Sequence, residues 1–124
     1  MYMKFSKLLL STVLLSTTFF LVWCGGVSLE DIDMTSQEAQ IASCLTDTGW
    51  QFMGTERCSH CKDQKARFGD AMLLVPYVDC DKNKAACTDA GVSVYPTRLS
   101  PTWELNPGGK DLTTLAQLAW CELN

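Results

Sequence analysis

Two cysteines, Cys58 and Cys61, are separated only by Ser59 and His60. This spacing allows the two sulfurs to form a disulfide, and proteins use it for thiol-disulfide exchange or for binding zinc. A helix is expected to begin at these cysteines, and a helix N-terminus favours an anion, so Cys58 is the expected nucleophilic thiolate. Cys61 would then attack the mixed disulfide and release the partner. His60 offers the Cys58 thiolate a further donor or a positive charge.

A second motif, Tyr95-Pro96-Thr97, follows the end of a predicted helix at Ala90-Gly91. A cis Tyr95-Pro96 bond would end an extended segment that faces the cysteines, because proline alone adopts the cis form at low cost. Proline also lacks an N–H group, which would leave the neighbouring backbone free to pair with a bound substrate strand. The two motifs together favour exchange chemistry over a zinc site.

The elements that must position these motifs alternate between helix and strand. Helices are expected over 36–46, from the cysteines to residue 72, over 83–90 and over 112–123. Extended segments are expected over 50–54, 77–79, 92–95 and 102–105, with a turn at 106–109. The first helix is expected to start with a capping box of Thr35 and Glu38 and to end at Gly49, and Asp111 is the expected N-cap of the last. This order predicts an α/β fold.

Composition limits the class of protein. The chain has 124 residues and seven cysteines, and 47% of its residues are hydrophobic, which excludes a disordered chain and a multi-domain enzyme. The formal net charge is −4 and two of its lysines lie near the N-terminus, so the remainder is acidic and nucleic-acid binding is not expected. Because His60 is the only histidine, a hydrolase with a histidine-based triad is not expected either.

The N-terminus has the pattern of an export signal. Residues 1–7 carry two lysines, residues 8–23 are uncharged and mostly apolar, and Cys24-Gly25-Gly26 follows. The apolar run is short for a membrane span, so residues 1–26 are interpreted as a secretory signal, with a membrane anchor or lipidation at Cys24 as alternatives. Residues 27–34 are expected to be a tether and 35–124 one domain. The predicted location is extracytoplasmic (periplasm, lumen or cell surface), where cysteines form disulfides.

The stretches CLTDTGWQFMGTERCSHCKDQKARFGDAM and VPYVDCDKNKAACTDAGVSVYPT resemble the thioredoxin superfamily. They are most similar to the thioredoxin-like domain associated with bacterial vitamin K epoxide reductase homologues. The resemblance implies a small central mixed sheet flanked by helices, with Cys58 as nucleophile, Cys61 as resolving cysteine and Pro96 as cis-proline. It implies exchange with cysteine-containing exported proteins and with a quinone-linked membrane reductase of the vitamin K epoxide reductase type. No bound cofactor or metal is expected, and a monomer is the default.

The chain departs from its relatives near both motifs. Glu56 and Arg57 replace aromatic residues before the first cysteine, and Ser59 stands where proline is common. The segment Arg98–Thr102 separates Tyr-Pro-Thr from the Trp-Glu that follows it directly in relatives, so Pro101 is an alternative cis-proline. Pro96 is preferred because its distance from Gly91 fits the family. The strand after Gly109 looks truncated, which weakens the expectation of a final β-hairpin.

The resemblance suggests that the remaining cysteines are structural. Cys80 is expected to bridge to Cys87, and Cys44 to Cys121, with a second relay dithiol at Cys80 and Cys87 as the alternative. Two other classes stay open: a zinc module that uses Cys58, Cys61, Cys80 and Cys87 with His60 as a further ligand, and a disulfide-stapled binding domain without exchange activity. The aspartates near the second cysteine pair are expected to be surface charges: Asp79, Asp81 and Asp89. The aromatic residues are expected to pack in the protein and not to bind a ligand: Trp50, Phe52, Phe68, Tyr77, Trp103 and Trp120.

Overall fold

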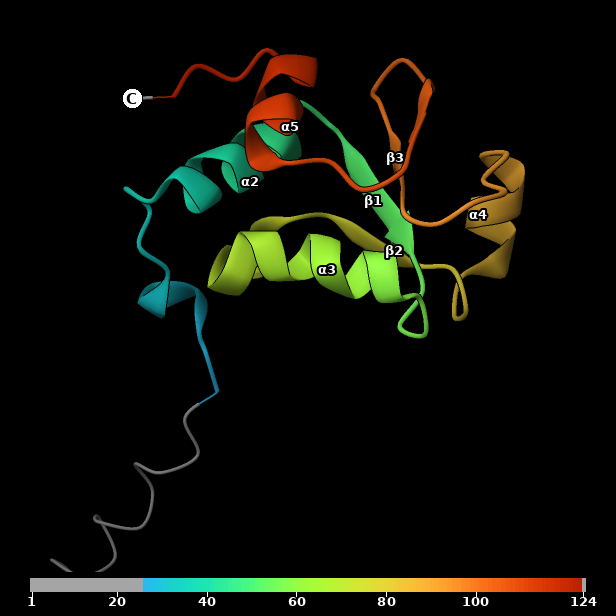
Figure 1. Cartoon of the computed structure of the whole chain (residues 1–124), viewed down its shortest axis with the longest axis horizontal. Helices are drawn as coiled ribbons and strands as arrows, with labels where there is room; N and C mark the ends of the chain where they lie inside the picture. The colour runs from blue at the N-terminus through green and yellow to red at the C-terminus, as the bar shows by residue number, and fades with distance from the viewer. Residues whose placement is uncertain (1–25, 124) are drawn as a thin grey trace, which may run out of the picture.

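The computed structural model describes residues 26–123, which form a mixed α/β fold (Figure 1). The α-helices are α2 (Gln37–Asp47), α3 (Ser59–Phe68), α4 (Lys84–Asp89) and α5 (Leu112–Leu118), and two 3-10 helices are η1 (Leu29–Asp31) and η2 (Gly69–Leu74). The strands are β1 (Gln51–Gly54), β2 (Tyr77–Asp79), β3 (Thr97–Leu99) and β4 (Leu105–Pro107). The predicted α/β class is confirmed.

The strands form one four-stranded sheet in the order β2-β1-β3-β4. Strand β1 pairs parallel with β2, which requires a crossover, and α3 with η2 supplies it. Strand β3 is antiparallel to both β1 and β4. Strand β1 has a neighbouring strand on each side, and the cysteine motif follows it closely in the chain, so the sheet positions the motif.

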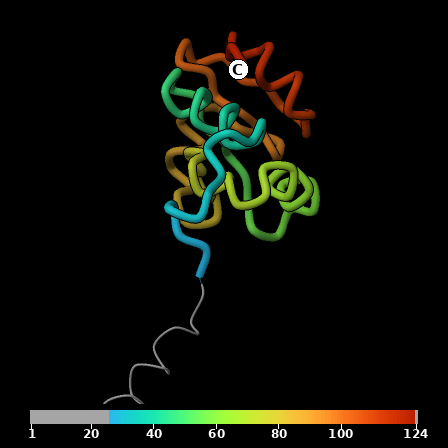
Figure 2. Tube along the Cα trace, turned by 90° about the vertical axis from the view of Figure 1, so that its left-hand side faces the viewer, coloured from blue at the N-terminus to red at the C-terminus, as the bar shows by residue number. Residues whose placement is uncertain are grey.

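Helices cover both faces of the sheet. Successive strand residues point to opposite faces, so Phe52 and Met53 of β1 enter different cores. Phe52 packs with residues of α2, α3 and α5, among them Ile41, Phe68 and Leu115. Met53 packs on the other side near α4, with the Cys80 and Cys87 side chains. In Figures 1 and 2 helix α2 lies between α5 and α3, the two helices that share the Phe52 core with it.

Helix α2 begins differently from the predicted capping box. Ser36 is its N-cap, and the Ser36 side chain accepts a hydrogen bond from the Ala39 N–H at 3.2 Å. Thr35 instead donates its hydroxyl to Asp33, so the predicted cap is wrong by one residue. The helix ends as predicted before Gly49, whose φ of +82° suits glycine.

The segment after α4 also differs from the prediction. Residues 92–93 have no regular structure and residues 94–96 form bends, and the strand starts only at Thr97, after a cis Tyr95-Pro96 bond. Arg98 and Leu99 continue that strand, so the segment that interrupts the family pattern is the end of β3 and the start of a turn. Ser100 closes the turn by accepting the Trp103 N–H and donating its own N–H to Glu104. The final hairpin is therefore present, with β4 before Gly108 and not after Gly109.

Helix α5 is shorter than predicted. Asp111 is its N-cap as expected and accepts the Thr114 N–H at 2.8 Å, but the helix ends at Leu118. Trp120 has a φ of +56°, and the Cys121 N–H bonds back to the Ala116 carbonyl, so the chain turns out of the helix there. This turn brings Cys121 to Cys44 on α2. Trp103 and Trp120 are 72% and 91% exposed, which contradicts the prediction that they are packed.

The N-terminal part of the described chain contacts the domain. Ile32, just after η1, is 7% exposed and belongs to the core that contains Phe52. The export signal and Cys24 lie outside the described residues. Among residues 26–123, no helix has the length and apolar character needed to cross a bilayer.

Candidate functional site

The Cys58-Ser59-His60-Cys61 motif forms the N-terminus of α3. Cys58 is the N-cap residue, and its sulfur accepts a hydrogen bond from the Cys61 backbone N–H at 3.2 Å. The Cys58 N–H bonds to the Thr55 carbonyl, which fixes the turn that leads from β1 into the helix. A sulfur in this position receives the unpaired N–H groups and the positive end of the helix dipole. The predicted helix opening at the cysteines is confirmed.

The two sulfurs differ in access to solvent. Cys58 is partly exposed, whereas Cys61 is completely buried in the core with Phe52 and Phe68. Both are free thiols in the structure. Burial raises the pKa of Cys61 to about 11, and hydrogen bonding with Cys58 adds to the rise. A partner can therefore reach Cys58, while Cys61 is held behind it as a protonated thiol.

Gly54, the last residue of β1, allows Cys61 to pack this closely. A Cβ atom at Gly54 would lie 2.8 Å from the Cys61 sulfur and 3.5 Å from the Tyr77 ring. Atoms cannot remain at 2.8 Å without displacement, so only glycine fits unless the sulfur moves. No sequence signal marks this role, because Gly54 resembles any glycine at a strand end.

The cis-proline directly precedes β3, the strand that pairs with β1. Met53 pairs with Thr97 in the antiparallel β1–β3 ladder, and the same register continued by one residue brings Pro96 opposite Gly54. Pro96 is buried, while the adjacent Val94 and Tyr95 are 52% and 38% exposed. The cis bond lies at Pro96 and not at Pro101, in agreement with the prediction from the distance between Pro96 and Gly91. Through Gly54, the two sequence motifs meet at one end of the sheet.

His60 lies on the exposed surface of the first turn of α3. In the part of the chain that the structure describes, the Cys58 sulfur accepts a hydrogen bond from the Cys61 backbone, and the His60 ring forms none with the motif. The contribution of His60 to the Cys58 thiolate therefore stays a prediction.

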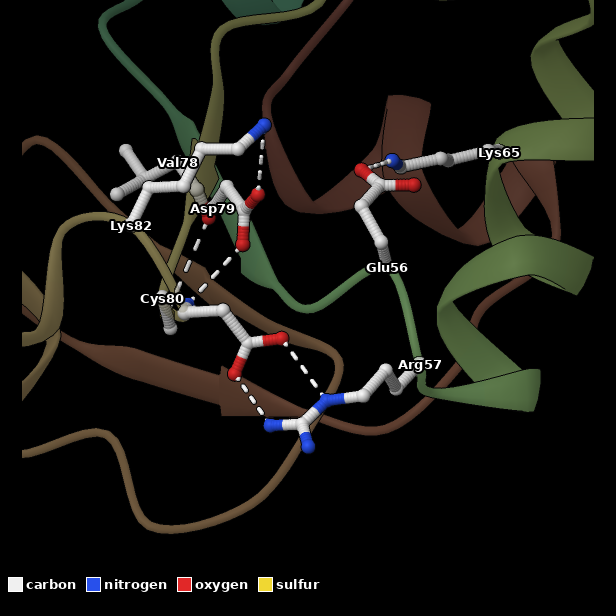
Figure 3. A network of polar contacts seen from close by, with 8 residues as sticks. Glu56, Arg57, Lys65, Val78, Asp79, Cys80 and Lys82 are labelled. Atoms are coloured by element: carbon white, nitrogen blue, oxygen red, sulfur yellow. Dashed lines mark hydrogen bonds and ion pairs between the residues drawn. The ribbon is translucent and has the colours of Figure 1, made fainter.

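Ion pairs involve the two residues that precede the cysteine motif, as Figure 3 shows for Glu56 and Arg57. Arg57 makes a two-point contact with Asp81, with Nη2 to Oδ1 at 2.8 Å and Nε to Oδ2 at 3.2 Å. Arg57 precedes Cys58 and Asp81 follows Cys80. This ion pair therefore joins the loop of residues 55–58, called the active loop below, to the loop that carries Cys80. Glu56 forms an ion pair with Lys65 of α3. The charged residues at 56 and 57, where the resemblance predicts aromatic residues, therefore both have ion-pair partners in this chain.

The aspartates near the second cysteine pair include one that is not a surface charge. Asp79 is 8% exposed and accepts the Asp81 N–H at 3.0 Å, and it forms an ion pair with Lys82 at 3.2 Å. The prediction of surface charge is therefore wrong for Asp79. Its hydrogen bonds and ion pair instead shape the turn after β2.

The other four cysteines of the described chain form two disulfides. Cys80 is bonded to Cys87 and Cys44 to Cys121, which are the pairs expected from the resemblance. The first encloses the turn that leads into α4, and the second fastens α2 to the segment after α5. Two disulfides indicate an oxidising, extracytoplasmic compartment. They also bear on the zinc alternative, because a sulfur in a disulfide is not available as a thiolate ligand.

Several buried polar residues near the site were missed by sequence reasoning. Arg98 is 3% exposed, donates one N–H to the Gly108 carbonyl at 2.9 Å and lies 5.5 Å from the Phe52 ring centroid. Burial lowers the pKa of Arg98 to about 10. Gln64 of α3 is 1% exposed and accepts the Lys110 N–H at 2.7 Å. Their charge and polarity suggested exposed positions, so no sequence signal pointed to their burial.

The chain matches no protein-family model. Its placement among known proteins therefore depends on the motifs and the geometry described above.

Proposed function

We propose that this chain is an exported thiol-disulfide oxidoreductase with a thioredoxin-like domain, and that Cys58 and Cys61 carry out the reaction. The observation that carries the proposal is the position of the Cys58 sulfur at the N-terminus of α3, with the buried Cys61 directly behind it. The sheet order β2-β1-β3-β4 and the cis Tyr95-Pro96 bond beside Gly54 are further support.

In the reducing direction, the Cys58 thiolate attacks one sulfur of a partner disulfide. A new bond forms between Cys58 and that sulfur, the partner's S–S bond breaks, and the partner's other sulfur leaves as a thiolate and takes up a proton. Cys61 then loses its proton and attacks the Cys58 sulfur, which releases the second partner thiolate. Two electrons pass to the partner, and Cys58 and Cys61 become a disulfide. The oxidising direction is the reverse of these steps.

Two features favour a protein as partner. Cys58 is partly exposed, so a flexible segment of another chain can approach it. Val94 and Tyr95 expose apolar surface beside the motif. Cysteine-containing exported proteins fit this surface, and a membrane reductase of the vitamin K epoxide reductase type is the proposed second partner. The leader at residues 1–26 is the proposed export signal.

Trapping of a mixed disulfide tests this function. Cys61→Ser removes the resolving sulfur, so a complex between Cys58 and a partner is expected to accumulate and to dissolve when a reductant is added. Cys58→Ser is the matched control and should trap nothing. If neither variant traps a thiol partner, and wild type binds its partner non-covalently, the domain is a stapled binding domain. If Cys58 and Cys61 react only after a metal is removed, the zinc module is correct.

A further inference from the structure

Buried Cys61 has one lysine as a close electrostatic neighbour. Lys65 follows Cys61 by four residues on α3, so the two side chains share one face of the helix. The Lys65 ammonium lies 3.7 Å from the centroid of the Tyr77 ring. The same ring lies against Gly54, as does the Cys61 sulfur. Lys65 and Cys61 therefore lie against one small part of the sheet.

Two contacts hold Lys65 in this place. The Tyr77 ring attracts the ammonium through its face, and Glu56 binds the ammonium from the active loop, as Figure 3 shows. The Lys65 side chain is only 22% exposed, so solvent screens its charge less than that of an ordinary surface lysine. A lysine fixed by a ring and a carboxylate acts on its surroundings from a defined position.

We infer that Lys65 is a positioning residue for the second step of exchange, and that its charge stabilises the Cys61 thiolate that must form before the mixed disulfide is resolved. The inference rests on the proposed function. The step needs no additional reactant: the Cys61 proton passes to solvent, and the thiolate then attacks Cys58. Consistent with this role, Lys65 opposes the rise in the Cys61 pKa that burial causes.

The other charged and titratable groups around Cys61 come from each neighbouring segment. Cys58 precedes it at the mouth of α3, Glu56 lies in the active loop, Tyr77 and Asp79 lie on β2, and Arg98 lies on β3. Asp79 is compensated by Lys82, and Glu56 by Lys65 itself. Arg98 adds a second positive charge that favours an anion at Cys61. Two cations, Lys65 and Arg98, therefore make the electrostatic potential at Cys61 more favourable for a thiolate. Of the two, Lys65 is paired with a carboxylate, that of Glu56.

The opposing roles of Lys65 and Glu56 give a sharp test. Lys65→Met keeps the length and apolar stem of the side chain but removes its charge, so the rate of mixed-disulfide resolution at neutral pH should fall about threefold. Two effects set this factor: a Cys61 pKa that is higher by one leaves about tenfold less thiolate, and the thiolate that remains is about threefold more nucleophilic. Lys65→Arg should restore the rate. Glu56→Gln leaves the lysine charge uncompensated, so the rate should rise and its pH profile should move to lower pH.

The experiment measures the resolution step alone, in the full chain with Cys24→Ser. Cys58 is first loaded with a small aromatic disulfide whose released thiol absorbs light, and its release by Cys61 is followed at several pH values. Lys62→Met is the matched control, because Lys62 is an exposed lysine on the same helix and its loss should leave the profile unchanged. Equal profiles for Lys65→Met and Lys62→Met would overturn the inference. Failure of wild type to load or to release the thiol would instead overturn the proposed function.

Discussion

Gly54→Ala is the substitution that most directly probes the packing behind the active cysteine. The added methyl group would lie 2.8 Å from the Cys61 sulfur and 3.4 Å from the Cys61 Cβ atom. The Cys61 side chain lies on the buried face of α3 with Gln64 and Phe68 and has little room to yield, so either the sulfur rotates or α3 moves away from β1. Such overpacking costs about 1–3 kcal/mol.

The cost of this substitution is measurable as a shift in melting temperature. For a domain of this size, a loss of 1 kcal/mol lowers the melting temperature by about 4–8 °C, so Gly54→Ala should lower it by at least about 4 °C. Circular dichroism of the reduced protein gives the value. The shift of the sulfur should also slow closure of the Cys58–Cys61 disulfide, which quenched alkylation and mass spectrometry can follow over time.

Gly109→Ala is the control for this substitution. A Cβ atom at Gly109 would have its nearest contact at 3.8 Å, with the Gln64 side-chain oxygen, so the change should be nearly neutral. If Gly54→Ala melts at the same temperature as Gly109→Ala and closes its disulfide at the wild-type rate, then Cys61 does not pack against Gly54 as described.

Three further predictions concern stability. The pKa of Cys61 rises from 9.0 to about 11 on folding, so this thiol ionises first in the unfolded chain as the pH increases. With Cys58 and Cys61 reduced, the wild-type protein should therefore lose stability between pH 9 and 11 relative to Cys61→Ala. Urea midpoints that change in parallel with pH in the two proteins would contradict this prediction. The Cys44–Cys121 bridge closes a separation of 77 residues and the Cys80–Cys87 bridge one of 7. In the chain-entropy model, replacing the cysteines of the first bridge by serine should lower the free energy of unfolding by about 4.5 kcal/mol, and those of the second by about 2.4 kcal/mol. The reverse ranking in denaturant titrations would contradict this prediction. Ser36→Ala should destabilise the protein by about 1 kcal/mol and Thr35→Ala by less, because Ser36 is the N-cap; thermal melts of the two variants decide.

The sequence predicted the elements whose local signals agree with their surroundings. The helix that opens at the cysteines, the strand Tyr77–Asp79 and the N-cap at Asp111 were each expected and are present. The capping box was misplaced because Thr35 and Ser36 are both good caps, and the choice between them depends on where the preceding turn at Asp33 directs the chain.

The parts of the fold that were missed depend on contacts between distant residues. Helix α5 was predicted to continue because nothing near Trp120 forbids a helix, yet the bridge from Cys121 to Cys44 requires the chain to turn. Arg98 was considered part of an insertion, but its pairing with Phe52 makes it a strand residue. Local patterns do not carry such information.

The candidate site divides in the same way. The positions of Cys58 and Cys61 at the start of a helix and of the cis bond at Pro96 were predictable, because spacing and residue type mark these residues. The surroundings of the site were not, because the roles of Gly54 and Lys65 arise only when β1, β2 and α3 meet. No pattern in the sequence marks a glycine or a lysine for such a position.

The reduction potential of the Cys58–Cys61 pair is the most direct test of the proposed function. The protein is equilibrated in glutathione buffers of graded composition, free thiols are alkylated, and the labelled cysteines are identified by mass spectrometry. The proposal predicts that Cys58 and Cys61 titrate together and reversibly within the glutathione range, while the Cys44–Cys121 and Cys80–Cys87 bridges stay unlabelled. The result that would contradict it is a Cys58–Cys61 pair that does not titrate, or that titrates only together with the two bridges.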